Sequence, residues 1–159
     1  MGRASGVLMA VSSLPNSYGI GTFGKEAYDF IDFLVRTKQR YWQVLPLTTT
    51  SYGDSPYQSF SAAAGSPYYI DLKDLEKLGY LKSDDFEDIS FGTSNTCVDY
   101  GALFVNHRRL LNRAFDRFMQ DIPADFEKFC HDHAEWLDPY AEFMSLKEEF
   151  GHKAYWEWP

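Results

Sequence analysis

The sequence predicts an α/β fold that starts with two parallel strands and continues into a mostly helical half. Residues 6–11 and 41–47 are short, nearly continuous apolar runs, which is the pattern of strands buried on both faces of a parallel sheet. Between them, residues 25–38 place apolar side chains at helical spacing. The order strand, helix, strand predicts one βαβ unit at the start of the chain.

The predicted helix at 25–38 has one apolar face, which we expect to cover one side of the sheet. That face carries Ala27, Phe30, Ile31, Leu34 and Val35. On the second strand, Tyr41 and Trp42 are predicted to be core residues. Two loops, at 12–24 and 48–65, leave the carboxyl ends of the strands, which is where α/β folds bind their ligands.

The second half of the sequence is predicted to be helical. Residues 66–72 indicate a short extended segment, 73–78 a short helix, and 83–95 a polar excursion without a strong element. Asp99 is the expected cap of a long helix that runs to about residue 120.

Two more helices are predicted near the end of the sequence. Residues 124–135 form the first of them. Asp138 is the predicted cap and Pro139 the first residue of the second, which ends at Gly151.

The charge and the cysteines limit the possible partners and the compartment. The formal net charge is −8, from 15 Lys and Arg against 23 Asp and Glu, and such a surface repels the phosphates of nucleic acids. The acidic stretch 84–88 is interpreted as solvated surface, and His107 and His133 as structural histidines. Cys97 and Cys130 lack metal-ligand spacing, so two thiols in a reducing compartment are favoured over one disulfide. With no signal peptide and no membrane-spanning run in the sequence, we expect a cytoplasmic protein.

The stretch Tyr52-Gly-Asp-Ser-Pro-Tyr-Gln-Ser-Phe60 is the strongest candidate for a binding site. Aromatic rings cover the apolar faces of sugars, while carboxylate, amide and hydroxyl groups pair with sugar hydroxyls. The composition of this loop therefore favours a sugar as the ligand. The loop does not contain a self-contained catalytic group.

Long strings of the sequence resemble the amylomaltases, the bacterial 4-α-glucanotransferases of glycoside hydrolase family 77. The matching strings are Ser12-Ser-Leu-Pro, Tyr18-Gly-Ile-Gly, Phe23-Gly, Arg40-Tyr-Trp-Gln-Val-Leu-Pro-Leu, Tyr52-Gly-Asp-Ser-Pro-Tyr-Gln-Ser-Phe-Ser, Ser66-Pro-Tyr-Tyr-Ile-Asp-Leu, Val98-Asp-Tyr-Gly and Trp156-Glu-Trp-Pro. The resemblance extends over nearly the whole chain.

The resemblance implies that the chain is the beginning of a (β/α)₈ TIM barrel. Residues 1–72 would hold the first two strands, the intervening helix and the substrate loop, and residues 73–159 a helical insertion subdomain. A complete barrel of this kind needs roughly 250 residues or more. We therefore expect the chain to be the N-terminal fragment of a longer protein.

The resemblance also implies the activity of the parent protein: transfer of α-1,4-glucan segments between maltooligosaccharides or starch, with retention of configuration. No metal or organic cofactor is implied. The family's catalytic carboxylates lie on later strands, so we expect no catalytic residue in this chain and no activity from the 159 residues alone. The oligomeric state and the acceptor preference stay open.

Binding residues are what the resemblance transfers to this chain. Tyr57 would stack on or pack beside the sugar at the reacting subsite, and Ser55 would contact the donor glucan. Asp54 and Gln58 would hold the loop or reach sugar hydroxyls.

A second glucan-contact surface is implied at Tyr52. Its aromatic partner in some family members stands at the position of Phe104, where phenylalanine keeps the stacking face but lacks the hydroxyl. Three alternatives to this enzymatic interpretation remain. The first is a well-packed loop without a ligand. The second is a non-catalytic carbohydrate-binding module, which would have to close its core around only two strands. The third is a structural or regulatory truncation product that pairs with other subunits through exposed apolar helix faces.

Overall fold

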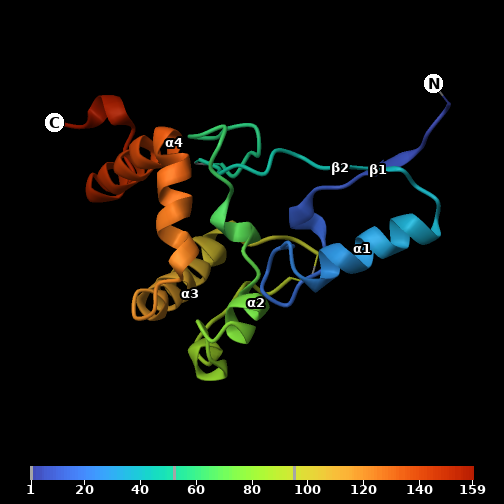
Figure 1. Cartoon of the computed structure of the whole chain (residues 1–159), viewed down its shortest axis with the longest axis horizontal. Helices are drawn as coiled ribbons and strands as arrows, with labels where there is room; N and C mark the ends of the chain where they lie inside the picture. Colours follow the sequence, from blue (N-terminus) through green and yellow to red (C-terminus); the bar gives the residue numbers. More distant parts are fainter. Residues whose placement is uncertain (1, 52, 95) are drawn as a thin grey trace.

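Two short strands and four α-helices follow one another along the chain in a computed structural model, which describes residues 2–51, 53–94 and 96–159. The elements are β1 (Gly6–Leu8), α1 (Lys25–Arg36), β2 (Tyr41–Gln43), α2 (Leu72–Lys77), α3 (Tyr100–Phe118) and α4 (Ala124–Glu149). The strands and α1 form one arm of the molecule, α3 and α4 form the other, and α2 lies between them (Figure 1). The two termini lie at opposite ends of this arrangement.

The predicted βαβ unit is confirmed. Strands β1 and β2 are parallel, and Val7 pairs with Trp42 in their register. The ring of Phe30 on α1 packs edge-to-face against Trp42, with ring centroids 4.9 Å apart, and the Trp42 indole donates a hydrogen bond of 2.8 Å to the Met9 carbonyl. A first core forms under α1 from Val11, Leu14 and Ala27 with the surrounding side chains of Met9, Phe30, Trp42, Val44, Leu47 and Tyr69.

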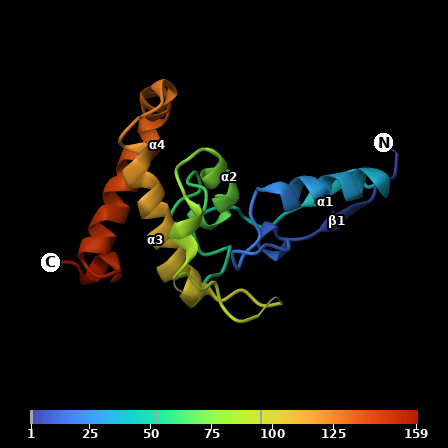
Figure 2. The ribbon, with the colours of Figure 1, turned by 90° about the horizontal axis from the view of Figure 1, so that it is seen from below.

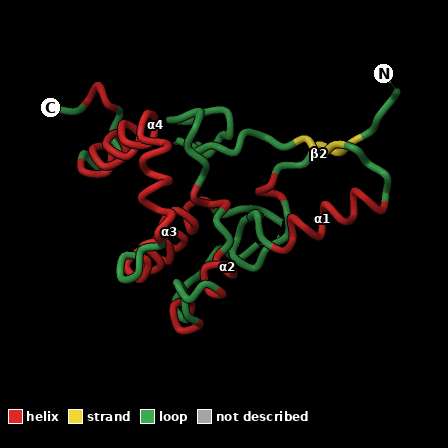
Figure 3. The backbone as a smooth tube through the Cα atoms, viewed as in Figure 1, coloured by secondary structure: helices red, strands yellow, loops and turns green. Residues whose placement is uncertain are grey.

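The prediction that both strands are buried on both faces is wrong for the described residues. Successive side chains of a strand point to opposite faces, and α1 covers only the face that carries Val7 and Trp42. On the other face Leu8 is 61% exposed and Tyr41 is 66% exposed, so Tyr41 is not a core residue here. The strands are also shorter than predicted, at three residues each (Figure 3).

A second core joins α2 to α3. Its buried members are Leu72, Leu81, Leu110 and Ala114. The predicted long helix is confirmed as α3, and Asp99 caps it by accepting a hydrogen bond of 2.9 Å from the Ala102 backbone. The segment at 66–72, which we predicted to be extended, instead contains a 3-10 turn at Pro67–Tyr69.

The acidic stretch at 84–88 is only partly the solvated surface that we predicted. Residues Ser83–Phe86 form a 3-10 turn, and the side chain of Asp85 is buried beneath α3 with 11% of its surface exposed. There it pairs with Arg117, which also donates a hydrogen bond of 2.9 Å to the Tyr80 carbonyl. An inward-pointing acid paired with arginine thus fixes the excursion to α3, while Asp84 and Asp88 are exposed.

The two predicted C-terminal helices are one continuous helix, α4, with Pro139 in its interior. Proline removes one backbone donor, which leaves the carbonyl of residue 135 without its helical partner. Both Glu135 and Pro139 are exposed, so this carbonyl faces water and the helix continues. Figure 2 shows α4 as one long helix beside α3. The pair is antiparallel, with Phe118 against Phe126 at one end and an ion pair between Arg108 and Glu148 at the other.

Among the described residues, no helix has the length and the apolar character that crossing a bilayer requires. Cys97 and Cys130 are both free thiols, as expected.

Candidate ligand-binding site

The candidate loop is closed at its base by backbone pairing. Thr48 and Gly65 form an antiparallel bridge, and the Ser66 amide donates a hydrogen bond of 2.8 Å to the Leu47 carbonyl. Loops whose ends meet in this way are compact units that pack with their own side chains. The loop is therefore a defined structure at the end of the segment that follows β2.

Hydrogen bonds inside the loop fix the position of Tyr57. The Ser51 amide donates to the Gln58 carbonyl at 3.0 Å, and the Gln58 amide donates to the Ser55 carbonyl at 3.0 Å. The second bond closes a turn whose central residues are Pro56 and Tyr57. Proline is favoured at the first of the two central positions of a turn, because its ring fixes φ near the value that this position needs. Tyr57 thus stands at the outside of a stiff turn.

The Tyr57 side chain is 76% exposed and borders an open groove of about 450 Å³. The groove is lined by Pro46, Thr48, Pro56, Tyr57, Ser59, Phe60, Ser61 and Ala62. Two aromatic rings, prolines and serine hydroxyls together offer apolar surface and hydrogen-bonding groups, which is the combination that a sugar ring requires. Because the backbone of this turn is already fixed, a ligand that stacks on Tyr57 has to order only the side chain.

Asp54 does not line this groove. It lines a smaller and more enclosed pocket of about 200 Å³, together with Tyr68, Tyr69 and Tyr100. Burial raises the pKa of the Asp54 carboxyl, and burial likewise raises the pKa of the three tyrosine hydroxyls. Pro56 borders both cavities, so it separates Asp54 from Tyr57.

The backbone at Asp54 has an unusual conformation, with φ at +54° directly after Gly53 at +95°. Aspartate tolerates this left-handed region better than most residues. The Asp54 amide donates to the Ser51 carbonyl at 3.1 Å. This hydrogen bond joins the backbone of Asp54 to that of Ser51.

The other predicted site residues do not all gather at the groove. Ser55 is half-buried in the turn, and Gln58 is exposed beside Tyr57. Phe104 lies on α3, 48% exposed, with its ring 5.4 Å from the ring of His152. Tyr52 lies outside the described residues, so the predicted pairing of Tyr52 with Phe104 stays a prediction.

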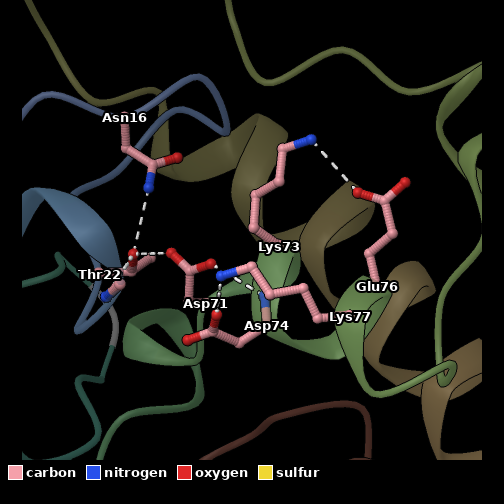
Figure 4. Close-up of polar contacts among 8 residues, drawn as sticks. Asn16, Thr22, Asp71, Lys73, Asp74, Glu76 and Lys77 are labelled. Carbon is pink, nitrogen blue, oxygen red and sulfur yellow. Dashed lines mark hydrogen bonds and ion pairs between the residues drawn. The ribbon is translucent and has the colours of Figure 1, made fainter.

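A buried network that the sequence analysis missed fixes the other loop, at 12–24. The Thr22 hydroxyl donates a hydrogen bond of 2.5 Å to Asp71, and Asn16 donates one of 3.1 Å to Thr22 (Figure 4). Asp71 also caps α2 through the Asp74 backbone amide. Gly24 lies close to this network, since a β-carbon at this position would lie 1.9 Å from the Asp71 carboxylate. The sequence did offer one signal for this role of Asp71: it directly precedes the short helix α2, and aspartate is a preferred helix cap.

His107, which the sequence analysis interpreted as a structural histidine, is also a buried polar group. Its side chain is 1% exposed, and neither ring nitrogen makes a hydrogen bond of good geometry. Burial lowers the pKa of His107 to about 4, although the nearby Ile70 backbone acts in the opposite direction. His107 packs edge-on against Tyr68, so it supports the wall of the Asp54 pocket.

The site offers binding groups but few reactive ones. Of the described residues that line the two cavities, Asp54 is the only carboxylate. Residues 2–51, 53–94 and 96–159 contain no cluster of three His, Cys, Asp or Glu side chains that could hold a metal ion. A retaining glycoside mechanism requires two carboxyls about 5–5.5 Å apart. The described residues that line the two cavities supply one carboxylate, where such a mechanism needs two.

Comparison with known protein families gives one match over most of the chain. The model of the family described as 4-alpha-glucanotransferase matches residues 9–159. The 4-alpha-glucanotransferase of Streptococcus pneumoniae serotype 4 is 55% identical over 159 residues, which is 99% of this chain and 31% of that protein. The enzyme of the same name from Thermus thermophilus is 45% identical over 161 residues, again 99% of this chain and 31% of that protein.

Among solved structures, the amylomaltase from Streptococcus agalactiae in complex with acarbose is similar along the whole chain. Its TM-score is 0.93 at 51% sequence identity, and the match covers 99% of this chain and 32% of that one. The chain thus spans about a third of the length of the relatives that it matches.

Proposed function

Because this chain belongs to the 4-alpha-glucanotransferase family, we propose that it supplies the glucan-binding N-terminal third of such an enzyme. The parent protein would transfer α-1,4-glucan segments between maltooligosaccharides, with retention of configuration. The observation that supports this most directly is Tyr57. It is an exposed aromatic side chain on a turn fixed by hydrogen bonds, at the edge of an open groove.

The ligand in the proposal is an α-1,4-glucan or maltooligosaccharide. The Streptococcus agalactiae amylomaltase, 51% identical to this chain, was solved with acarbose, which supports a glucan-like ligand here. Tyr57 would stack on or beside the sugar at the reacting subsite, and Ser55 and Gln58 would reach the donor chain from the same turn. Asp54 would act by holding the loop, since it lies in the separate pocket.

The architecture in the proposal is a (β/α)₈ barrel. Strands β1 and β2 would be its first two strands, and residues 73–159 the helical insertion subdomain. A barrel places its active site where the loops leave the carboxyl ends of the strands, and both loops described above leave β1 and β2 at those ends. The exposed face of Leu8 and Tyr41 would pack against later parts of the barrel.

The two catalytic carboxylates would come from outside these 159 residues. Asp54 lines only the smaller pocket, and the described residues that line the two cavities include no second carboxylate. The non-catalytic carbohydrate-binding module is the second candidate. It is disfavoured because one face of the two-stranded sheet, the face that carries Leu8 and Tyr41, would stay exposed to water in a free-standing module.

A chimera tests the proposal. These 159 residues replace the matching 32% of the Streptococcus agalactiae amylomaltase, and the chimera is assayed with maltotriose for release of glucose and formation of longer chains. We expect transfer activity from the chimera and none from the 159 residues alone, although the latter should bind acarbose. A chimera that melts cooperatively and elutes as the parent amylomaltase does, but is inactive, would contradict the proposal. Transfer by the 159 residues alone would contradict the placement of the carboxylates.

A further inference from the structure

The tip of the candidate loop contacts the last third of the chain. Phe60, three residues beyond Tyr57, packs against Phe143 of α4 with ring centroids 5.9 Å apart. The ammonium of Lys147, one helical turn further along α4, lies 4.8 Å from the centre of the Phe60 ring. The Phe60 ring of the loop thus contacts both an aromatic ring and a cation, which lie one turn apart on α4. Figure 1 shows the loop beside this end of α4.

Lys147 is fixed in this position from its other side. Its ammonium donates hydrogen bonds of 3.1 Å to the carbonyls of His152 and of Lys153, just beyond the end of α4. Cations are favoured at the carboxyl end of a helix, where carbonyl groups lack helical partners. Lys147 therefore links the end of α4 to the loop.

Phe143 also packs against the segment that follows α4. Its ring lies 5.6 Å from the ring of Trp158, and Trp158 packs against Phe150 at 5.3 Å. The Trp158 indole donates a hydrogen bond of 3.3 Å to the Lys153 carbonyl. We call Phe60, Phe143, Lys147 and Trp158 the loop clasp. Three of its four members come from α4 and the segment that follows it.

The connection from the clasp to Tyr57 is short and stiff. The Ser59 hydroxyl donates to the Ser61 carbonyl at 2.7 Å and accepts from the Ser61 amide at 3.2 Å, which fixes the backbone on both sides of Phe60. Tyr57 and Phe60 both line the open groove. A change in the position of Phe60 should therefore change the position of Tyr57.

We propose that Phe60 and Lys147 are positioning residues: the clasp holds the loop against α4 so that Tyr57 is presented to the donor glucan. This inference rests on the proposed function, because it assigns a role to Tyr57 in glucan binding. Contacts of one aromatic ring with a second ring and with a cation are both favourable at a partly exposed site. Helix α4 would thereby contribute to substrate binding through the loop, although its Lys147 does not line the groove.

The test measures KM and kcat of the chimera for maltotriose. Lys147→Met keeps most of the length of the side chain and removes its charge, while Lys147→Arg keeps a cation over the ring. We expect Lys147→Met and Phe60→Ala to raise KM about threefold to tenfold with kcat little changed, because they weaken binding of ground state and transition state alike. Lys147→Arg should restore the original KM. Phe129→Ala, an exposed aromatic on α4 away from the loop, is the matched control.

A double-mutant cycle separates positioning from a purely structural effect. In a Tyr57→Ala background, Lys147→Met should no longer change KM, because there is no ring left to position. If Lys147→Met leaves KM unchanged, or raises it equally with and without Tyr57, the clasp proposal is overturned. If Tyr57→Ala alone leaves KM and kcat unchanged, the role of Tyr57 in the proposed function fails instead. Thermal melts of each variant identify any loss that comes from unfolding.

Discussion

Arg117 on α3 holds Asp85 by two hydrogen bonds, one of 2.5 Å from Nη1 to Oδ2 and one of 3.0 Å from Nη2 to Oδ1. This pair joins the excursion after α2 to the helix that carries the second core. The Arg117 guanidinium is the main reason that the pKa of Asp85 is lowered to about 2, and the Lys82 backbone amide adds to the effect. Arg113 donates a further hydrogen bond of 2.7 Å to the Asp85 carbonyl.

The first prediction concerns the stability that this pair provides. The pKa of Asp85 is lower in the folded chain than the ordinary value of 3.8, so its contribution is complete above about pH 4 and is lost as the pH falls toward 2. Asp85→Asn should lower the free energy of unfolding by about 2 kcal/mol at pH 7. Urea unfolding of the 159-residue chain at several pH values measures this.

The neighbouring exposed residue provides the control for Asp85. Asp84→Asn removes the same charge from the same turn without touching Arg117, so it should change the free energy of unfolding by less than about 0.5 kcal/mol. Equal losses from the two variants would show that general charge, and not the pair with Arg117, stabilises the excursion.

The sequence predicted the elements of this fold better than their burial. Asp99 as a cap and the helical spacing around Leu110 are local signals, and both were confirmed. Burial depends on partners that are distant in sequence, which is why Tyr41 was placed in the core and Asp85 on the surface. Nothing local to Asp85 indicates that Arg117, on another element, would neutralise it.

The candidate site shows the same difference between local signals, which could be predicted, and distant contacts, which could not. The loop with Tyr57 was identified from its composition, but its division into a groove with Tyr57 and a pocket with Asp54 depends on the backbone turn around Pro56. Pro139 illustrates the opposite error. A local rule predicted a new helix there, but the exposed position of this proline allows α4 to continue.

The second prediction concerns Gly24, where the loop at 12–24 meets α2. A methyl group at this position would overlap the Asp71 carboxylate, which is held by Thr22 and by the Asp74 amide. Gly24→Ala should therefore lower the free energy of unfolding by about 1–3 kcal/mol, measured by urea unfolding. Gly65→Ala is the control, because no atom lies within 4 Å of the added carbon. A Gly24→Ala variant as stable as Gly65→Ala would mean that Asp71 is free to move.

The third prediction is a pH dependence that originates at His107. Its pKa is about 4 in the folded chain and near 6.5 when unfolded, so the unfolded state binds the proton more readily between these values. The stability from the neutral, buried ring is therefore complete above pH 6.5 and declines as the pH falls toward 4. Between pH 7 and pH 5 this decline amounts to about 2 kcal/mol.

Substitution of His107 tests this directly. His107→Leu removes two ring nitrogens that lack hydrogen-bond partners of good geometry and should abolish this part of the pH dependence. Urea unfolding at pH 7 and pH 5 gives the comparison, with His131→Leu on the exposed face of α4 as the control. A His107→Leu variant that loses as much stability on acidification as the original chain would assign the pH dependence to other groups.

The last prediction concerns the Tyr57 ring as a stacking surface. In the chimera, Tyr57→Phe keeps the ring and should retain most of kcat/KM for maltotriose, whereas Tyr57→Ala should lower it about tenfold or more, which corresponds to about 1.4 kcal/mol of lost binding. Tyr57→Leu, which is apolar but not flat, should fall between the two. Tyr28→Ala is the control, since Tyr28 is similarly exposed but lies on the outer face of α1, away from the groove. If Tyr57→Phe were as impaired as Tyr57→Ala, the hydroxyl and not the ring face would be the group that contacts the glucan.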